Sequence, residues 1–293
     1  MGGRALARPP GQGEQGLSLG GMRRLIELTY RYARRRPRDG RLIRILEPLY
    51  QTFAVHRGSL RPTLRFVRSH GLEVSGGPFA GVRYPRSAVL RIPRLVPHLA
   101  GTYEIELHPA LEAVIRSQPS LIVNIGSGFG YYAVGMARRC PEAKVLTYED
   151  DPYRVRVCAD FARLNGVDGQ IDQRGLCTPD ALADLHPPAG SAVIADCEGA
   201  EAELIEPARI DWLRHSTLVI EVHEHLDAAL PGKLGERLAQ THSMEWIRPR
   251  KRYLLDPEYR AGWRAGFSLI QQEMMMSEPR PVRTSWLWAT PTQ

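Results

Sequence analysis

From residue 109 onward, short apolar runs alternate with amphipathic stretches in a regular rhythm. Runs such as 120–126 (SLIVNIG) are mostly apolar along their length, which is typical of strands buried on both faces. The stretches between them, such as 131–140 (YYAVGMARRC), place apolar residues at helical spacing. Strands that alternate with helices form parallel sheets, because each helix returns the chain to the same end. The pattern therefore predicts an α/β fold with helices on both faces of a sheet.

Seven strands are expected in all, and the alternation with helices predicts that the sheet is mostly parallel. They fall in 120–126, 143–150, 170–176, 191–199, 216–224, 244–250 and 284–291. Helices are expected between them in 109–118, 131–140, 151–166, 200–207 and 231–242. Ligands of such sheets bind at the carboxyl ends of the strands, where the winding reverses.

The first third of the chain follows a different pattern. Residues 1–20 are rich in Gly, Gln and Pro and are expected to be disordered. Residues 21–37 and 41–57 show helical spacing with many arginines, and 72–85 indicates short strands joined by a glycine turn. The expected organisation is a tail (1–20), an arginine-rich helical and short-strand extension (21–95) and a sheet domain (96–293). The extension would form a lid or an interface.

Composition adds a charge asymmetry to this picture. Hydrophobic residues make up 43% and charged residues 24% of the 293 residues, as in ordinary soluble proteins. The net charge is +7, but residues 1–94 hold 19 Arg against five acidic residues. Such a basic segment could meet nucleic acid, anionic lipid or a phosphorylated substrate, or be a solvated face packed on the acidic domain. No apolar run is long enough to span a bilayer, so a cytoplasmic protein is expected.

The four cysteines are scattered and contain no CxxC pair. This usage favours free thiols over a disulfide framework or a zinc site.

A glycine turn follows the strand in 120–126. Gly126, Gly128 and Gly130 are spaced GxGxG, whereas a dinucleotide-binding turn prefers GxGxxG. Glu149 ends the next strand, where a carboxylate can accept hydrogen bonds from two ribose hydroxyls. Together these features predict a nucleoside cofactor, and the GxGxG spacing is that of class I S-adenosylmethionine (SAM) methyltransferases. Asn124 stands where an acid that contacts the ammonium group of the cofactor is common, and an amide adds no charge there.

Several segments together resemble the FkbM-like branch of class I SAM-dependent methyltransferases. They are NIGSGFGYYAVGMA, YEDDPYRVRVCADFARLNGV, VIADCEGAEAELIEP and LVIEVHEH, and the upstream GTYEIEL and the late SEPRPVRTSWLWATP are similar to a bacterial subgroup. The resemblance covers about 78–293. It implies the Rossmann-like methyltransferase fold, SAM as cofactor, and usually O-methylation of a sugar, a polyketide or another natural-product hydroxyl.

The cofactor would lie across the glycine turn, with Glu149 on the ribose and the adenine near Leu176 and Cys177, where the third strand ends. Tyr103 and Glu104 could fold over it. The expected cofactor contacts are Tyr103, Asn124, Gly126, Ser127, Gly128, Gly130, Glu149, Asp150, Leu176, Cys177 and Asp196.

Acidic and histidine side chains gather where the fourth and fifth strands end. Asp196 and Glu198 end one strand and Glu221 and His223 the next, and residues two apart point to the same side. If the strands are neighbours, these groups converge at the cofactor edge. His223 could be the base that takes the acceptor proton, with Glu221 or Glu198 orienting its other nitrogen. Alternatively, Asp196, Glu221 and His223 could bind Mg²⁺ or Mn²⁺.

The sequence thus predicts a SAM-dependent O-methyltransferase of a small metabolite. Two alternatives remain open: an RNA or polyanion methyltransferase guided by the basic arm, and a non-catalytic SAM-binding partner subunit. Met274, Met275 and Met276 could cover an apolar acceptor or pack beside the last strand. A homodimer is also left open.

Overall fold

The computed structural model describes residues 60–92, 94–249, 266–267, 272 and 284–292. The tail and helices expected in 1–57 lie outside these ranges, as does the loop with Met274 to Met276. None of the described helices is both long and apolar enough to cross a membrane.

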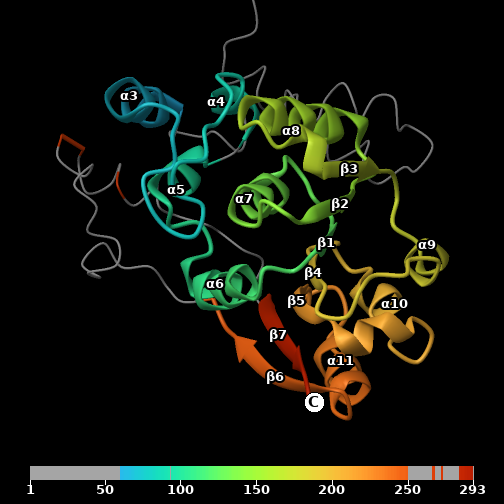
Figure 1. The fold of residues 1–293 in the computed structure, drawn as a ribbon. Helices are drawn as coiled ribbons and strands as arrows, with labels where there is room; N and C mark the ends of the chain where they lie inside the picture. Colours follow the sequence, from blue (N-terminus) through green and yellow to red (C-terminus); the bar gives the residue numbers. More distant parts are fainter. Residues whose placement is uncertain (1–59, 93, 250–265, 268–271, 273–283, 293) are drawn as a thin grey trace, which may run out of the picture. The chain divides into compact units, whose positions relative to one another are not determined.

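One seven-stranded sheet organises the described residues (Figure 1). Its strands are β1 (Leu121–Ile125), β2 (Lys144–Tyr148), β3 (Ile171–Arg174), β4 (Ala192–Ala195), β5 (Thr217–Val222), β6 (His242–Ile247) and β7 (Ser285–Pro291). The order across the sheet is β3-β2-β1-β4-β5-β7-β6. The pairs from β3 to β5 are parallel, and β7 runs antiparallel to both β5 and β6. The predicted α/β fold with a mostly parallel seven-stranded sheet is confirmed.

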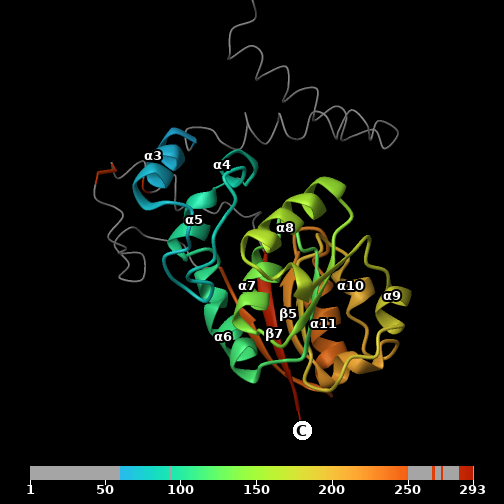
Figure 2. The ribbon, with the colours of Figure 1, turned by 45° about the horizontal axis from the view of Figure 1, so that its top comes forward.

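The central strands are apolar on both faces because helices cover both. Along β1, Ile122 packs into one hydrophobic core and Val123 into the other. The first core contains α6 (His108–Ser117), α7 (Tyr131–Arg139) and α8 (Pro152–Leu164). The second contains α9 (Pro179–Ala183), α10 (Glu201–Leu204) and α11 (Leu230–Leu238). Figure 2 shows the two groups of helices on opposite sides of the strands.

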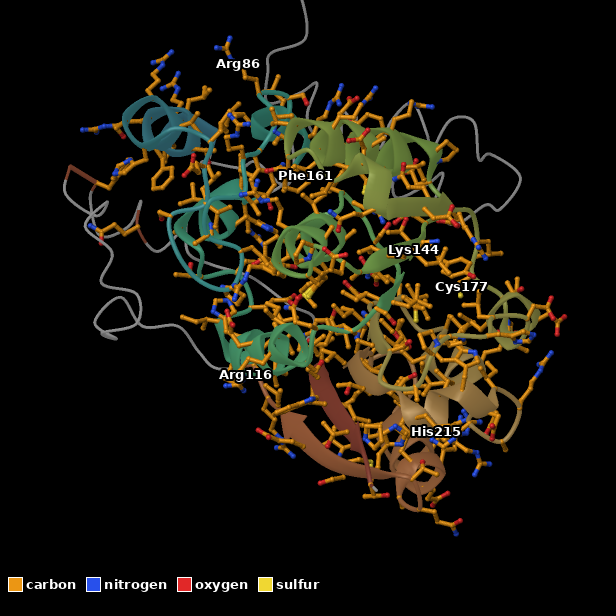
Figure 3. The ribbon with its side chains drawn as sticks, in the orientation of Figure 1. Arg86, Arg116, Lys144, Phe161, Cys177 and His215 are labelled. Carbon is orange, nitrogen blue, oxygen red and sulfur yellow. The ribbon has the colours of Figure 1, made fainter. Side chains whose placement is uncertain are left out.

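The chain itself marks where these helices begin and end. Asp151 caps α8 by accepting a hydrogen bond from the backbone N–H of Tyr153 at 2.8 Å, and Pro152 takes the first helical position. Asn165 and Gly166 end α8, as the sequence predicts. The described part also contains short 3-10 helices: η3 (Ile105–Leu107), η4 (Asp168–Gln170) and η5 (Asp211–His215). Figure 3 shows Phe161 of α8 turned into the core, whereas the exposed Arg86 and Arg116 lie at the periphery.

Residues 60–100 pack against the same core as α6, α7 and α8. They form α3 (Leu60–His70), α4 (Ala88–Arg91) and α5 (Leu95–Ala100). The short strands expected in 72–85 reduce to a single bridge between Glu73 and Arg83. Phe79 lies so close to α7 that a Cβ added at Gly135 would come within 2.4 Å of its ring. The part of the extension that the structure describes is therefore packed directly on the sheet domain.

Candidate functional site

A cavity of about 470 Å³ opens at the carboxyl ends of β1, β4 and β5. From β1 the chain proceeds to β2 and β3 on one side and then crosses to β4 and β5 on the other side. Parallel sheets of this kind bind ligands at the strand ends where the winding reverses in this way. The side chains and glycines that line it are Tyr84, Ile92, Arg94, His98, Tyr103, Glu104, Gly126, Ser127, Gly128, Phe129, Tyr131, Tyr132, Arg154, Asp196, Glu198 and Glu221. The cavity thus joins the glycine turn to the acidic ends of β4 and β5.

The three glycines of the turn all have positive φ, but each serves a different need. A Cβ at Gly126 would lie 1.8 Å from the carbonyl oxygen of Asp196, so only glycine lets the turn approach β4. A Cβ at Gly130 would lie 2.7 Å from the sulfur of Cys158 on α8. Gly128 differs, because a Cβ there would meet nothing within 4 Å and the residue lines the cavity. The space beside Gly128 is therefore open to a ligand.

Glu149 connects the end of β2 to the glycine turn. Its Oε2 accepts a hydrogen bond from the backbone N–H of Gly128 at 2.9 Å, and its Oε1 accepts one from that of Asp151 at 3.0 Å. Burial raises the pKa of Glu149, although these hydrogen bonds and Arg154 oppose the shift. Each carboxylate oxygen retains a second acceptor position. Glu149 is 7% exposed and does not itself line the cavity, so its ribose role stays a prediction.

Asn124 is fully buried and does not line the cavity. Its side-chain nitrogen donates a hydrogen bond to the carbonyl oxygen of Ile194 on β4 at 3.1 Å, and its oxygen has no hydrogen-bond partner among the described residues. Asn124 therefore joins two neighbouring strands, and the structure gives it no exposed surface for a cofactor.

Some of the remaining predicted cofactor contacts line the cavity and others do not. Tyr103, Ser127 and Asp196 line the cavity. Asp150 and Leu176 are exposed, with 68% of Leu176 accessible, and Cys177 is half-buried. Burial raises the pKa of the Cys177 thiol to about 12. The adenine site proposed near Leu176 and Cys177 thus lies outside the cavity lining.

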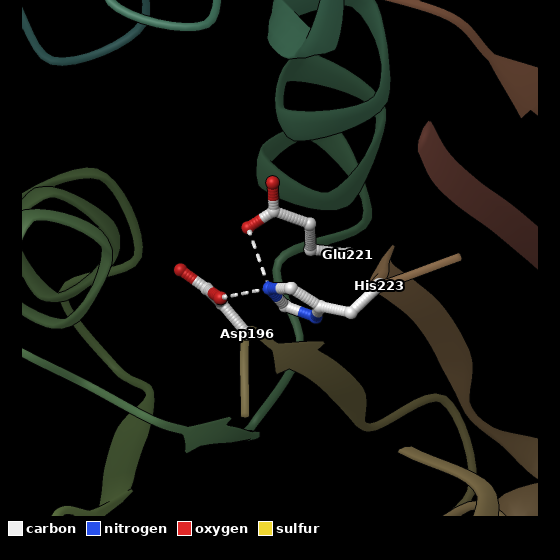
Figure 4. Close-up of side chains that lie close together, drawn as sticks. All are labelled: Asp196, Glu221 and His223. Atoms are coloured by element: carbon white, nitrogen blue, oxygen red, sulfur yellow. Dashed lines mark ion pairs between the residues drawn. The ribbon is translucent and has the colours of Figure 1, made fainter. Parts of the chain in front are cut away.

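The polar cluster predicted at the ends of β4 and β5 forms as expected, because the two strands are parallel neighbours (Figure 4). Nε2 of His223 lies 3.6 Å from a carboxylate oxygen of Asp196 and 3.8 Å from one of Glu221. A carboxylate oxygen of the exposed Glu198 lies 3.7 Å from the same nitrogen. Asp196 and Glu221 line the cavity, whereas His223 is 3% exposed and lies behind them.

The group that orients His223 is Glu201, not Glu221 or Glu198 as the sequence suggests. Nδ1 of His223 lies 2.5 Å from Oε1 of Glu201, which also accepts a hydrogen bond from the backbone N–H of Gly199 at 3.2 Å. Glu201 is fully buried at the start of α10. It belongs to the DCEGAE segment, and the acid two residues after Gly199 in that segment is the signal that could have indicated it.

The three carboxylates near Nε2 of His223 favour a positive charge at this nitrogen. Burial alone would lower the pKa of His223, but the hydrogen bond and charge of Glu201, with Asp196 and Glu198, raise it. Burial would raise the pKa of Glu201, but its hydrogen bonds with His223 and backbone N–H groups lower it. Since Nδ1–H is held by Glu201, a bare Nε2 lone pair would face three carboxylates. A proton or a metal ion at Nε2 removes that repulsion.

The second wall of the cavity comes from the segment before β1 and was largely missed from the sequence. His98 stacks on Tyr103 with ring centroids 3.9 Å apart, and Tyr131 meets both rings edge-on. Among the described residues, the non-glycine residues with positive φ are Arg94, Glu104, Gln118 and Glu198. Every one of these except Gln118 lines the cavity. Strained backbone is thus concentrated at the candidate site, as it is at many ligand sites.

Comparisons with known proteins found distant structural similarities. No family model and no curated protein matches the chain. Among solved structures, the O-methyltransferase TomG from Streptomyces achromogenes, involved in tomaymycin synthesis and determined with SAM, is 17% identical, covering 80% of this chain and 90% of its own, with a TM-score of 0.45. A putative O-methyltransferase from Klebsiella pneumoniae is 20% identical, covering 80% and 90%, with a TM-score of 0.39.

An O-methyltransferase from Bacillus cereus in complex with SAH is 12% identical, covering 80% of this chain and 91% of its own, with a TM-score of 0.41. At these identities and scores the likeness carries no argument about this chain. The FkbM-like resemblance stays a prediction, and any functional conclusion has to come from the residues of the cavity.

Proposed function

We propose that this chain is a SAM-dependent methyltransferase that methylates an oxygen of a small-molecule acceptor. The observation that carries the proposal is the single cavity that holds both the glycine turn and the carboxylates of β4 and β5. The turn would hold the cofactor, and Asp196 and Glu221 would face the acceptor. One site can then bring the two reactants together, which is the main contribution a protein makes to methyl transfer.

The residues of the cavity fit the amino-acid and sulfonium parts of SAM. Gly128 leaves its approach open, and the buried hydroxyl of Ser127 has no hydrogen-bond partner among the described residues. Glu104, Asp196, Glu198 and Glu221 bring acidic groups to the lining, beside Arg94 and Arg154. SAM carries positive charge on its sulfonium and ammonium groups, so an acidic cavity suits it.

SAM, when bound, supplies a methyl group on a sulfonium, so the new O–C bond forms as the C–S bond breaks and its electrons return to sulfur. The chain has to exclude water, orient the acceptor hydroxyl and remove its proton. Asp196 and Glu221 line the cavity and can accept that proton. Nε2 of His223 lies within 3.8 Å of both and can take the proton onward when the imidazole is neutral. Glu201 holds the imidazole in place through Nδ1.

A divalent cation would fit the same cluster. The donor atoms of Asp196, Glu221 and His223 lie within 4.8 Å of one another. Glu201 on Nδ1 is the outer carboxylate that metal-binding histidines commonly have. Two carboxylates and an imidazole suit Mn²⁺ better than Mg²⁺, and such an ion would lower the pKa of an acceptor hydroxyl.

The rings of Tyr84, His98 and Tyr103 line the cavity, and Tyr84 belongs to the arginine-rich extension. This lining supports a lid role for the described part of the extension. An aromatic wall opposite acidic groups suits an acceptor with a flat or apolar body and a polar hydroxyl end.

The test combines SAM binding with an untargeted transfer assay. We expect calorimetry to show SAM and SAH binding, and methyl-labelled SAM incubated with extracts of the source cell to yield a labelled small molecule. Failure to bind either nucleoside would reject the proposal. Binding without labelled product in any extract would instead support a non-catalytic SAM-binding subunit, and label in RNA would support the polyanion alternative.

A further inference from the structure

We propose that Glu104 binds the ammonium group of the cofactor and so takes the place of the acid that is absent at position 124. The inference rests on the proposed SAM site. It concerns a residue on a different element from the glycine turn, in the loop between α5 and η3.

The burial of Asn124 opens the question. A ligand ammonium needs acceptors that reach the cavity. Asn124 is 0% exposed, and its side-chain nitrogen donates a hydrogen bond to the carbonyl oxygen of Ile194. Its side-chain oxygen could accept a hydrogen bond, but this atom is buried and Asn124 does not line the cavity. Whatever binds the ammonium therefore comes from elsewhere in the cavity.

Glu104 has the position and the chemistry. It lines the same cavity as Gly126 and Ser127, yet its accessible fraction is only 2%. A carboxylate in such a sheltered place interacts with a cation more strongly than one in water does. The other acids of the lining differ: Asp196, Glu198 and Glu221 all lie within 3.8 Å of Nε2 of His223. Glu104 differs from these acids in its place in the chain, since it precedes η3 whereas they lie in or directly after β4 and β5.

The surroundings of Glu104 hold its carboxylate in place. The hydroxyl of Tyr132 donates a hydrogen bond to its Oε2. Tyr132 lies in the first turn of α7, directly after the glycine turn, where the helix N-terminus favours negative charge. The buried hydroxyl of Ser127 lies in the same cavity and can accept a further hydrogen bond from an ammonium.

The backbone of Glu104 adds a second observation. Its φ is 47°, a left-handed conformation that is unfavourable for a residue with a Cβ. Its carbonyl oxygen accepts a hydrogen bond from the backbone N–H of Leu107, and η3 begins at the next residue. The turn therefore sets the carboxylate against Tyr132 at a conformational cost, as is common where a side chain serves a ligand.

The experiment compares two ligands that differ only in the ammonium group. They are SAH and its deaminated analogue, 5′-deoxy-5′-(3-carboxypropylthio)adenosine, measured by calorimetry on the full chain. The variants are Glu104→Gln and, as matched control, Glu106→Gln, which lies two residues away and does not line this cavity. We expect the unaltered protein and Glu106→Gln to bind SAH about tenfold or more tighter than the analogue, the usual scale of a charge-assisted contact.

Glu104→Gln should bind both ligands equally, with SAH reduced to the affinity of the analogue. Retained binding of the analogue also shows that this variant is folded. Equal losses for both ligands, or an unchanged preference for SAH, would overturn the role of Glu104. If the unaltered protein binds neither SAH nor SAM, the proposed function fails first, which is a distinct result.

Discussion

Replacing Glu201 by Gln tests whether the buried pair with His223 organises the site. The change keeps the shape and the acceptor oxygen of the side chain but removes its charge. Glu201 is fully buried, His223 is 3% exposed, and 2.5 Å separates Oε1 from Nδ1. The pair is therefore a charge-assisted hydrogen bond that water does not screen.

The size of the effect follows from that burial. Removing one charge of a buried, hydrogen-bonded pair typically costs about 3–5 kcal/mol, because the other charge is left without compensation. Here Asp196, Glu198 and Glu221 still face Nε2 and offset part of the loss. We expect Glu201→Gln to lower the free energy of unfolding by about 2–3 kcal/mol near pH 6, the scale of a hydrogen bond to a charged group.

The pH dependence gives the sharper test. The pKa of His223 is raised above its ordinary value of 6.5, so its stabilising contribution is full below 6.5 and is lost as pH rises through the raised value. The pKa of Glu201 is lowered, so its contribution is present above 4.5 and is lost as pH falls through the lowered value. The difference between the two proteins should therefore be largest near pH 6 and shrink at alkaline pH.

Urea unfolding of both proteins across this pH range measures the difference, and NMR titration of His223 measures its pKa directly. The pKa of His223 should fall in Glu201→Gln. The matched control is Glu203→Gln, an exposed position on the same helix, which should change neither quantity. A stability difference that is the same at pH 6 and at alkaline pH, or an unchanged pKa of His223, would refute the charge-pair interpretation.

Three further expectations concern the turn, the ribose site and the cation. Gly126→Ala should lower the free energy of unfolding by about 3 kcal/mol, because its Cβ would meet backbone at 1.8 Å, whereas Gly128→Ala should cost only about 1–2 kcal/mol of backbone strain; equal losses in urea unfolding would contradict this. Glu149→Ala should sharply weaken SAH binding in calorimetry, and an unchanged affinity would remove the ribose assignment. Dialysis against EDTA should lower methyl transfer and added Mn²⁺ should restore it, whereas a metal-free protein with full rate would show that a proton supplies the charge at His223.

Much of the fold could be predicted from local pattern. The mostly apolar runs indicate which segments are buried strands, and the glycine spacing indicates the turn after β1. The same periodicity places Asp196, Glu221 and His223 at strand ends, so their convergence needs only that β4 and β5 be neighbours. These features depend on residues close together in the sequence, which is why the sequence by itself determined them.

Tertiary structure decided the contacts between distant segments. Glu201 reaches His223 only because α10 turns back over the end of β5, and the burial of Asn124 depends on its alignment with Ile194 across two strands. The approach of Glu104 to Tyr132 likewise spans 28 residues. Periodicity determines which way a side chain points along one element, but not which loop closes over it, because loop closure depends on the packing of the whole core.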